Sequence, residues 1–158
     1  MPNPKKLPIH VLLAAACLLS AEAAMANMGA EEENESIDPT YIAGKKAVEA
    51  QDWKTAIELL SKAMKTTSNN SEAHNLLGYA YRKAGNLEAS FAEYAQALKL
   101  DPANRHAHEY IGEAYLLTGN LAKAEQHLAE LQRLCTPIPC EEFRELKRAV
   151  DEYRKTRK

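Results

Sequence analysis

The chain has 158 residues, enough for one modest domain. Its 20 basic and 22 acidic residues nearly balance, so the formal charge of −2 gives no sign of a nucleic-acid partner or an anionic membrane surface. With six glycines, seven prolines, 6% aromatic residues and abundant alanine, the composition favours helices over strands.

Residues 1–26 have the pattern of a secretory signal peptide. Lys5 and Lys6 form a short positive segment, the apolar run 9–21 follows, and the tripeptide AMA at 24–26 offers a cleavage site. The run is shorter than the roughly 20 residues that a membrane-spanning helix needs, so an uncleaved anchor is the weaker alternative. We therefore expect cleavage near Ala26, an exported, periplasmic location and no stable membrane insertion after cleavage.

Residues 27–36 differ in composition from what precedes and follows them. They carry glutamate at positions 31, 32, 33 and 35 and almost nothing apolar. Such a segment cannot bury enough apolar surface to offset the entropy lost on ordering. We interpret it as a flexible acidic leader.

From residue 37 onward the sequence repeats itself with a period of 34 residues, which separates Gly44 from Gly78 and Gly78 from Gly112. Small residues recur with the same offset at 56, 90 and 124. Turn signals recur as well, although the first of them has Gln51 where the later ones have glycine. The pattern predicts three helix-turn-helix units at about residues 37–70, 71–104 and 105–136, the first being the least regular.

A helix-turn-helix period of about 34 residues resembles the tetratricopeptide repeat (TPR). The resemblance covers residues 37–136, and three matches in register carry it. It implies an all-α fold, a right-handed α-solenoid in which the first helix of each unit lines a concave groove. Proteins of this kind are binding scaffolds rather than enzymes.

The prolines at 137 and 139 interrupt the helical pattern. Residues 140–157 then predict a final helix, with an apolar stripe of Phe143, Leu146, Val150 and Tyr153 and a charged opposite face. We expect this stripe to pack on the last unit as a C-terminal capping helix.

Cys135 and Cys140 are the cysteines that remain if the signal is cleaved. In an oxidising compartment such a pair around a tight proline loop indicates a structural disulfide. Redox chemistry is the alternative, but four residues separate the cysteines, not the two of a thioredoxin-like motif.

The TPR resemblance implies which side chains face the groove. By register these are expected to bind a partner, and they combine tyrosines, which suit peptide recognition, with charges of both signs. The predicted groove residues are Tyr41, Lys45, Glu49, Asn75, Tyr79, Arg82, Lys83, His106, Glu109, Tyr110 and Glu113.

The best-known TPR ligand site, the carboxylate clamp for the acidic tail of cytosolic chaperones, is not matched. That pattern requires lysine and asparagine in the first repeat, asparagine in the second, and lysine and arginine in the third. The corresponding residues here are Tyr41, Lys45, Leu76, His106 and Tyr110. A ligand of different chemistry is therefore expected.

The sequence offers no constellation for catalysis. It has no recognisable nucleophile motif and no glycine-rich phosphate loop. His106 and His108 lie two residues apart on a predicted helix, so they cannot chelate one ion together. We expect no enzymatic activity, no catalytic residue, no cofactor and no metal site.

These observations together predict an exported, non-enzymatic TPR scaffold that binds a peptide or protein segment in its groove. A structural self-assembly module is the alternative, and a redox helper using the cysteine pair is a weaker one. The partner is expected to be a protein or peptide and not nucleic acid. Its identity and the oligomeric state are left open by the sequence.

Overall fold

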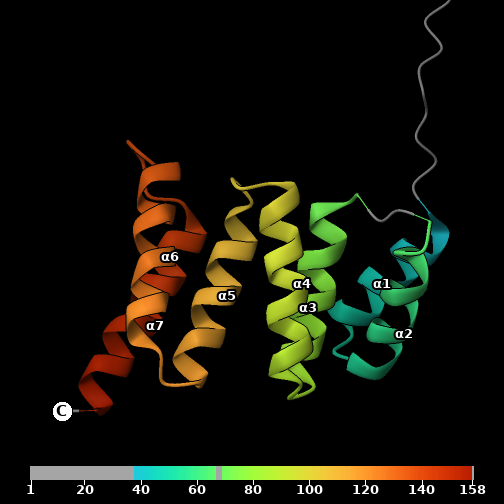
Figure 1. The fold of residues 1–158 in the computed structure, drawn as a ribbon, viewed down its shortest axis with the longest axis horizontal. Helices are drawn as coiled ribbons and strands as arrows, with labels where there is room; N and C mark the ends of the chain where they lie inside the picture. The colour runs from blue at the N-terminus through green and yellow to red at the C-terminus, as the bar shows by residue number, and fades with distance from the viewer. Residues whose placement is uncertain (1–37, 67–68, 158) are drawn as a thin grey trace, which may run out of the picture. The chain divides into compact units, whose positions relative to one another are not determined.

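The computed structural model describes residues 38–66 and 69–157 (Figure 1). The predicted signal peptide and acidic leader lie outside the described residues. All regular secondary structure in the described part of the chain is helical, and none of these helices is both long and apolar enough to cross a membrane. The helices are α1 (Pro39–Glu49), α2 (Trp53–Ala63), α3 (Ser71–Lys83), α4 (Leu87–Leu100), α5 (Arg105–Leu117), α6 (Leu121–Leu134) and α7 (Glu141–Thr156).

The helices pack as successive pairs, which is the architecture that the sequence predicts. α1 packs on α2, α3 on α4 and α5 on α6, and the second helix of each pair also contacts the first helix of the next. α7 follows the last pair and packs against both α5 and α6 (Figure 1). The all-α fold of helix pairs with a C-terminal capping helix is therefore confirmed.

A side-chain cap begins each of the first six helices. In every case an aspartate or asparagine at the N-cap accepts a hydrogen bond from a backbone N–H two or three residues further on. Each cap satisfies one of the N–H groups that a helix start leaves unpaired, which stabilises the helix by about 1 kcal/mol. The capping residues are Asp38, Asp52, Asn70, Asn86, Asn104 and Asn120.

Each turn within a pair contains one residue in the left-handed backbone conformation. Gly85 and Gly119 adopt φ of 84° and 79°, and Gln51 holds the equivalent place in the first pair with φ of 58°. Glycine enters this region without steric cost, whereas a residue with a side chain is strained there. The irregular first turn of the sequence therefore keeps the same geometry with a less suitable residue.

The repeated glycines mark the closest helix contacts. A Cβ atom at Gly44 would lie 2.9 Å from the Leu60 side chain, and one at Gly78 would lie 2.8 Å from the Tyr94 ring. Both neighbours belong to the second helix of the same pair. At Gly112 the nearest side chain is instead Leu146 of α7, at 2.6 Å. In the third pair, therefore, α7 makes the closest contact at the repeated glycine.

The apolar core is divided among the junctions between pairs. One cluster centres on Ala47, Ala56 and Ala80, and a second on Tyr94, Ile111 and Ala114. The third is the richest and joins α5 and α6 to α7 through Leu116, Ala124, Leu131, Leu146 and Val150, with the Phe143 and Tyr153 rings packed against it. The predicted apolar stripe of the last helix therefore covers the third pair.

We predict that Gly78→Ala lowers stability although alanine is the better helix former. Helix propensity alone would raise the free energy of unfolding by about 1 kcal/mol. The new methyl group would meet the fully buried Tyr94 ring, and overpacking of this kind costs about 1–3 kcal/mol. Thermal and urea unfolding should show a net loss of stability. The control Lys99→Ala, on the exposed face of α4, should change the free energy of unfolding little. A more stable Gly78→Ala protein would contradict the close contact.

Candidate functional site

Four rings form a connected series across the three helix pairs. Trp53 at the start of α2 meets Tyr79 of α3 with ring centroids 5.8 Å apart, and Tyr79 meets Tyr110 of α5 at 4.8 Å. Tyr110 in turn stacks with His106, one turn earlier on α5, at 6.1 Å. These separations are typical of favourable aromatic pairs. We call these four residues the aromatic row.

Two cations from the end of α3 lie over the row. The Arg82 guanidinium is 5.2 Å from the Tyr79 centroid and 5.5 Å from that of Tyr110. The Lys83 ammonium is 5.8 Å from the Trp53 ring and 5.7 Å from that of Tyr79. All four distances permit cation–π attraction, which stabilises the packing of the two cations on the rings.

Arg82 is also fixed by an ion pair. It donates from Nη1 to Glu113 Oε2 at 2.5 Å, and its own side chain is only 10% exposed. This link joins α3 to α5 directly. The arginine therefore positions the second and third pairs against each other as well as contributing charge.

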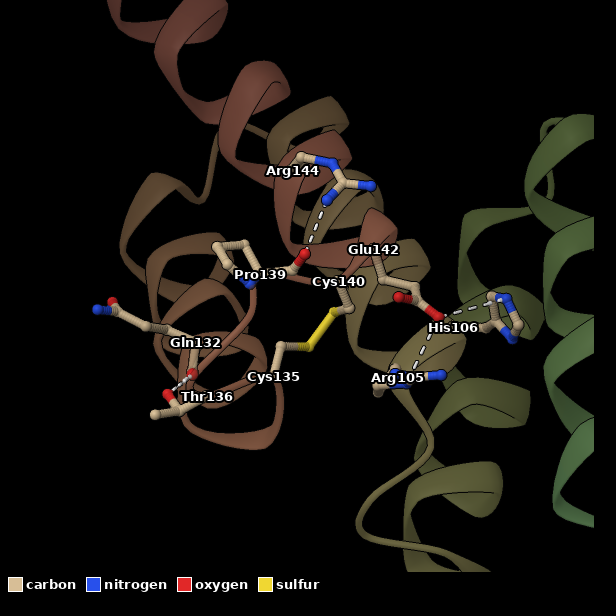
Figure 2. Close-up of a disulfide and its surroundings, with 9 residues drawn as sticks. All are labelled: Arg105, His106, Gln132, Cys135, Thr136, Pro139, Cys140, Glu142 and Arg144. Atoms are coloured by element: carbon tan, nitrogen blue, oxygen red, sulfur yellow. Dashed lines mark hydrogen bonds and ion pairs between the residues drawn. A yellow bond between two sulfur atoms is a disulfide. The ribbon is translucent and has the colours of Figure 1, made fainter.

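An acidic pocket lies where the N-terminal turn of α7 approaches α5. The cavity measures about 220 Å³ and is lined by His106, Glu109, Tyr110, Glu141, Glu142 and Glu145. Glu142 is nearly buried, and its Oε1 lies 3.5 Å from Arg105 Nε and 3.6 Å from His106 Nε2 (Figure 2). His106 and Tyr110 belong to both the pocket and the aromatic row, so the two features are continuous.

Glu109 is a second buried acid of this pocket, with 9% of its surface exposed. Burial is the main cause that raises the pKa of Glu109 to about 8, and the negative charges of Glu113, Glu142 and Glu145 raise it further. Arg82 acts in the opposite direction. The carboxyl group therefore binds a proton near neutral pH, where an exposed glutamate would not.

The structure brings together seven of the eleven predicted groove residues. Tyr79, Arg82, Lys83, His106, Glu109, Tyr110 and Glu113 are joined by the ring contacts, the ion pair and the pocket described above.

The other four predicted residues lie apart from this group. Asn75 is fully buried, so its side chain is not on an open face as expected. Tyr41 is half-buried, and burial together with the negative charge of Glu72 raises its pKa. Lys45 and Glu49 are exposed on α1, and within the described residues neither forms an ion pair with the row or the pocket.

The cysteines of the last loop form a disulfide, with Cys135 and Cys140 joined at 1.97 Å and their Cα atoms 5.4 Å apart (Figure 2). Cys135 ends α6 and Cys140 precedes α7, so the bond connects the two helices at their closest ends. The loop is further held by the Thr136 hydroxyl, which donates to the Gln132 carbonyl at 2.7 Å. The sulfur atoms also lie near Glu142, but disulfide sulfurs are not the thiolates that ligate metals.

Two histidines of the first helices make polar contacts to the second helix of the same pair. His74 Nδ1 lies 2.7 Å from Glu93 Oε2, and the equivalent pair one period later joins His108 to His127 at 2.9 Å. Burial, reinforced by His108, lowers the pKa of His127 to about 4. His127 is therefore neutral at physiological pH, and its half-buried ring stacks with Tyr115 at a centroid distance of 5.7 Å.

Two parts of the site are missing from the sequence prediction. Trp53 has the register of a packing residue, the place that leucine holds in the later pairs, yet it begins the aromatic row. Carboxylates at the start of a helix such as α7 are common because they suit the positive end of the helix dipole, so they do not by themselves indicate a pocket. No periodicity places α7 against α5, because α7 lies outside the repeat.

Comparison with known proteins agrees with this geometry. Residues 78–119 match the family described as TPR repeat. No curated protein matches the sequence. Among solved structures, the Yersinia enterocolitica type III secretion translocator chaperone SycD superimposes with a TM-score of 0.70 at 16% identity, over 77% of this chain and 86% of that one.

Two further structures hold bound segments. The TPR2B domain of yeast Sti1, in a complex with Hsp70, has a TM-score of 0.70 at 17% identity over 78% of this chain and 99% of the domain. SycD of Yersinia enterocolitica with a peptide of the translocator YopD has a TM-score of 0.65 at 19% identity, over 77% of this chain and 92% of that one. At these identities the likeness defines the fold. The described helices adopt the TPR fold, and the predicted resemblance is confirmed.

We predict that Glu109→Gln removes a pH dependence of stability. The pKa of Glu109 is about 8 in the folded chain against an ordinary value of 4.5. Between these values the folded state holds a proton that the unfolded state has lost, so stability falls as pH rises. His127 has the opposite sign, but its effect is confined to the range below about pH 6.5.

Urea unfolding between pH 6.5 and 8 therefore isolates Glu109. Across this window the free energy of unfolding of the unchanged chain should fall by up to about 2 kcal/mol more than that of Glu109→Gln. Glu58→Gln, which neutralises an exposed glutamate of α2, should behave like the unchanged chain. Parallel pH profiles for the chain and for Glu109→Gln would contradict the buried, protonated carboxyl group.

We also predict that Cys135→Ser with Cys140→Ser weakens the attachment of α7. Closing so short a loop stabilises by about 2 kcal/mol in the chain-entropy account. The free energy of unfolding should fall by that amount, and amide hydrogen exchange should accelerate in the first turns of α7 more than in α3 or α4. Unchanged exchange in α7 would show that packing alone holds this helix.

Proposed function

We propose that this chain is an exported, non-enzymatic scaffold that binds a peptide or protein segment across the aromatic row. The observation that carries the proposal is the continuity of the row. Ring contacts run from Trp53 through Tyr79 to Tyr110 and His106, so one surface extends over all three helix pairs. An extended segment needs such a surface, whereas a small molecule needs a closed cavity.

The chemistry of the row suits a peptide. Tyrosine and tryptophan offer large contact areas with few rotatable bonds, so little entropy is lost on binding. Arg82 and Lys83 add positive charge at the centre of the row, and Glu113 and the acidic pocket add negative charge towards α7. The polarity therefore changes along the surface, which would fix the direction of a bound segment.

The structural neighbours support this proposal at the level of fold. The Sti1 domain and SycD have been solved with an Hsp70 partner and a YopD peptide, respectively. The five positions of the carboxylate clamp do not carry the clamp residues here. We therefore propose that the segment bound by this chain differs in chemistry from an acidic chaperone tail.

Export is part of the proposal and rests on other observations. The positive start, the apolar run 9–21 and the AMA tripeptide at 24–26 support secretion. The disulfide between Cys135 and Cys140 is what an oxidising compartment permits. A periplasmic location would fit both.

The test is the double variant Tyr79→Ala with Tyr110→Ala. Removing both rings breaks the row at its centre, and the loss of one anchoring aromatic residue typically costs more than 1–2 kcal/mol of binding. Captured partner, measured by affinity purification of the mature chain from its own host, should fall at least tenfold. Circular dichroism must show retained helix.

The matched control removes apolar side chains elsewhere. Leu117 and Ile138 are 64% and 78% exposed, and neither belongs to the row or the pocket. Leu117→Ala with Ile138→Ala should leave capture unchanged. Equal capture by the row variant and the control would refute the assignment of the binding surface.

A further inference from the structure

We propose that the acidic pocket between α5 and α7 binds the arginine or lysine side chain of the segment that lies along the aromatic row. This inference rests on the proposed function and names one feature that the bound segment must have.

Glu109 lines the pocket and is nine-tenths buried, and the positive charge of Arg82 compensates its carboxylate only in part. Among the residues that the structure describes, no donor forms a hydrogen bond or an ion pair with its side chain. Burying a carboxyl group without a partner is unfavourable, and a buried polar group in a cavity calls for a ligand or another explanation. Glu141, on the rim of the same pocket, also has no ion-pair partner in the described part of the chain.

The remaining acids are already compensated. Glu113 accepts from Arg82 at 2.5 Å, and Glu145 accepts from Arg148 on the next turn of α7. Glu142 lies 3.5 Å from Arg105 and 3.6 Å from His106 (Figure 2). The pocket therefore has room for one more positive charge, next to Glu109 and Glu141.

The arrangement favours an organic cation over a metal ion. Within the described residues, the one set of three ligand atoms close enough to share an ion is Cys135, Cys140 and Glu142, which excludes Glu109. A hard cation such as Ca²⁺ requires six to eight converging oxygens. A guanidinium or ammonium group instead bonds to carboxylates spread around a cavity, and a volume of about 220 Å³ admits such a head group.

The pocket is placed to receive a side chain from the row. His106 and Tyr110 line the pocket and also end the row, so a segment lying over Tyr79 and Tyr110 passes its mouth. The two rings offer apolar faces to the methylene stem of arginine or lysine, while the charged head reaches the carboxylates.

Binding is coupled to the proton on Glu109. A positive ligand favours the ionised carboxylate, so it releases the proton that burial and the charges of Glu113, Glu142 and Glu145 retain. Arg82, Arg105 and His106 are the positive or imidazole groups that face these acids. Affinity for the cation should therefore rise as the pH increases from 6.5 to 8 and then level off.

The direct test uses N-acetyl-arginine amide as the probe and N-acetyl-citrulline amide as its neutral, isosteric control. Titration of the mature chain, followed by NMR, should shift the His106 and Tyr110 resonances. The arginine probe should bind at least tenfold more tightly than the citrulline control. Glu109→Gln and Glu141→Gln should each weaken that binding at least threefold, and Glu58→Gln should not. Two variants are used because either alone could perturb folding, which circular dichroism reports.

Three results would overturn the inference. These are equal binding of the citrulline probe, unchanged binding by folded Glu109→Gln and Glu141→Gln, and saturation of the same resonances by Ca²⁺ in place of the arginine probe. A loss of affinity with rising pH would contradict the coupled proton release.

Selection from a random peptide library separates this inference from the proposed function. The inference and the proposed function would both be supported if the selected peptides depend on the aromatic row and share a basic residue, and if selection on Glu109→Gln yields peptides without that shared residue. Row-dependent peptides without a shared basic residue would refute the inference and leave the scaffold function standing. A library that yields no row-dependent peptide would refute the scaffold function itself.

Discussion

Close approach at a glycine is the contact on which the rest of this fold depends. The first helix of each pair carries Gly44, Gly78 or Gly112 at its narrowest point, where Leu60, Tyr94 or Leu146 fills the space that a Cβ atom would need. Such tight packing leaves little room for each first helix to shift against its neighbour. The aromatic row is ordered because α3 and α5, which carry most of it, are fixed in this way.

The third of these contacts has consequences that the other two do not. Because Leu146 of α7 meets Gly112, the start of α7 lies beside α5, and its glutamates meet Glu109 and His106. The disulfide holds the same end of α7 to α6. The capping helix therefore covers the last core cluster and also adds an acidic wall to the surface that we assign to binding.

Much of the fold could be predicted from the sequence, because a 34-residue period repeats the same local pattern three times. The caps, the glycine turns and the apolar stripe of the last helix follow from local rules of capping and amphipathicity. That α7 packs on the last pair follows from its apolar stripe, but its close approach to Gly112 of α5 could not be predicted, because α7 lies outside the period. The groove prediction includes the buried Asn75 and omits Trp53, since register alone does not say whether a side chain is covered by its neighbours.

Site-specific photo-crosslinking tests the central claim most directly, since it reports where a partner lies. A photoreactive phenylalanine analogue in place of Tyr79 samples the aromatic row, and the same residue in place of Lys99 samples an exposed part of α4. Irradiation in the native host should give a discrete adduct from position 79 and none from position 99, with the crosslinked peptide mapped to one segment of one partner. Adducts from position 99 alone, or equally from both, would contradict binding along the row.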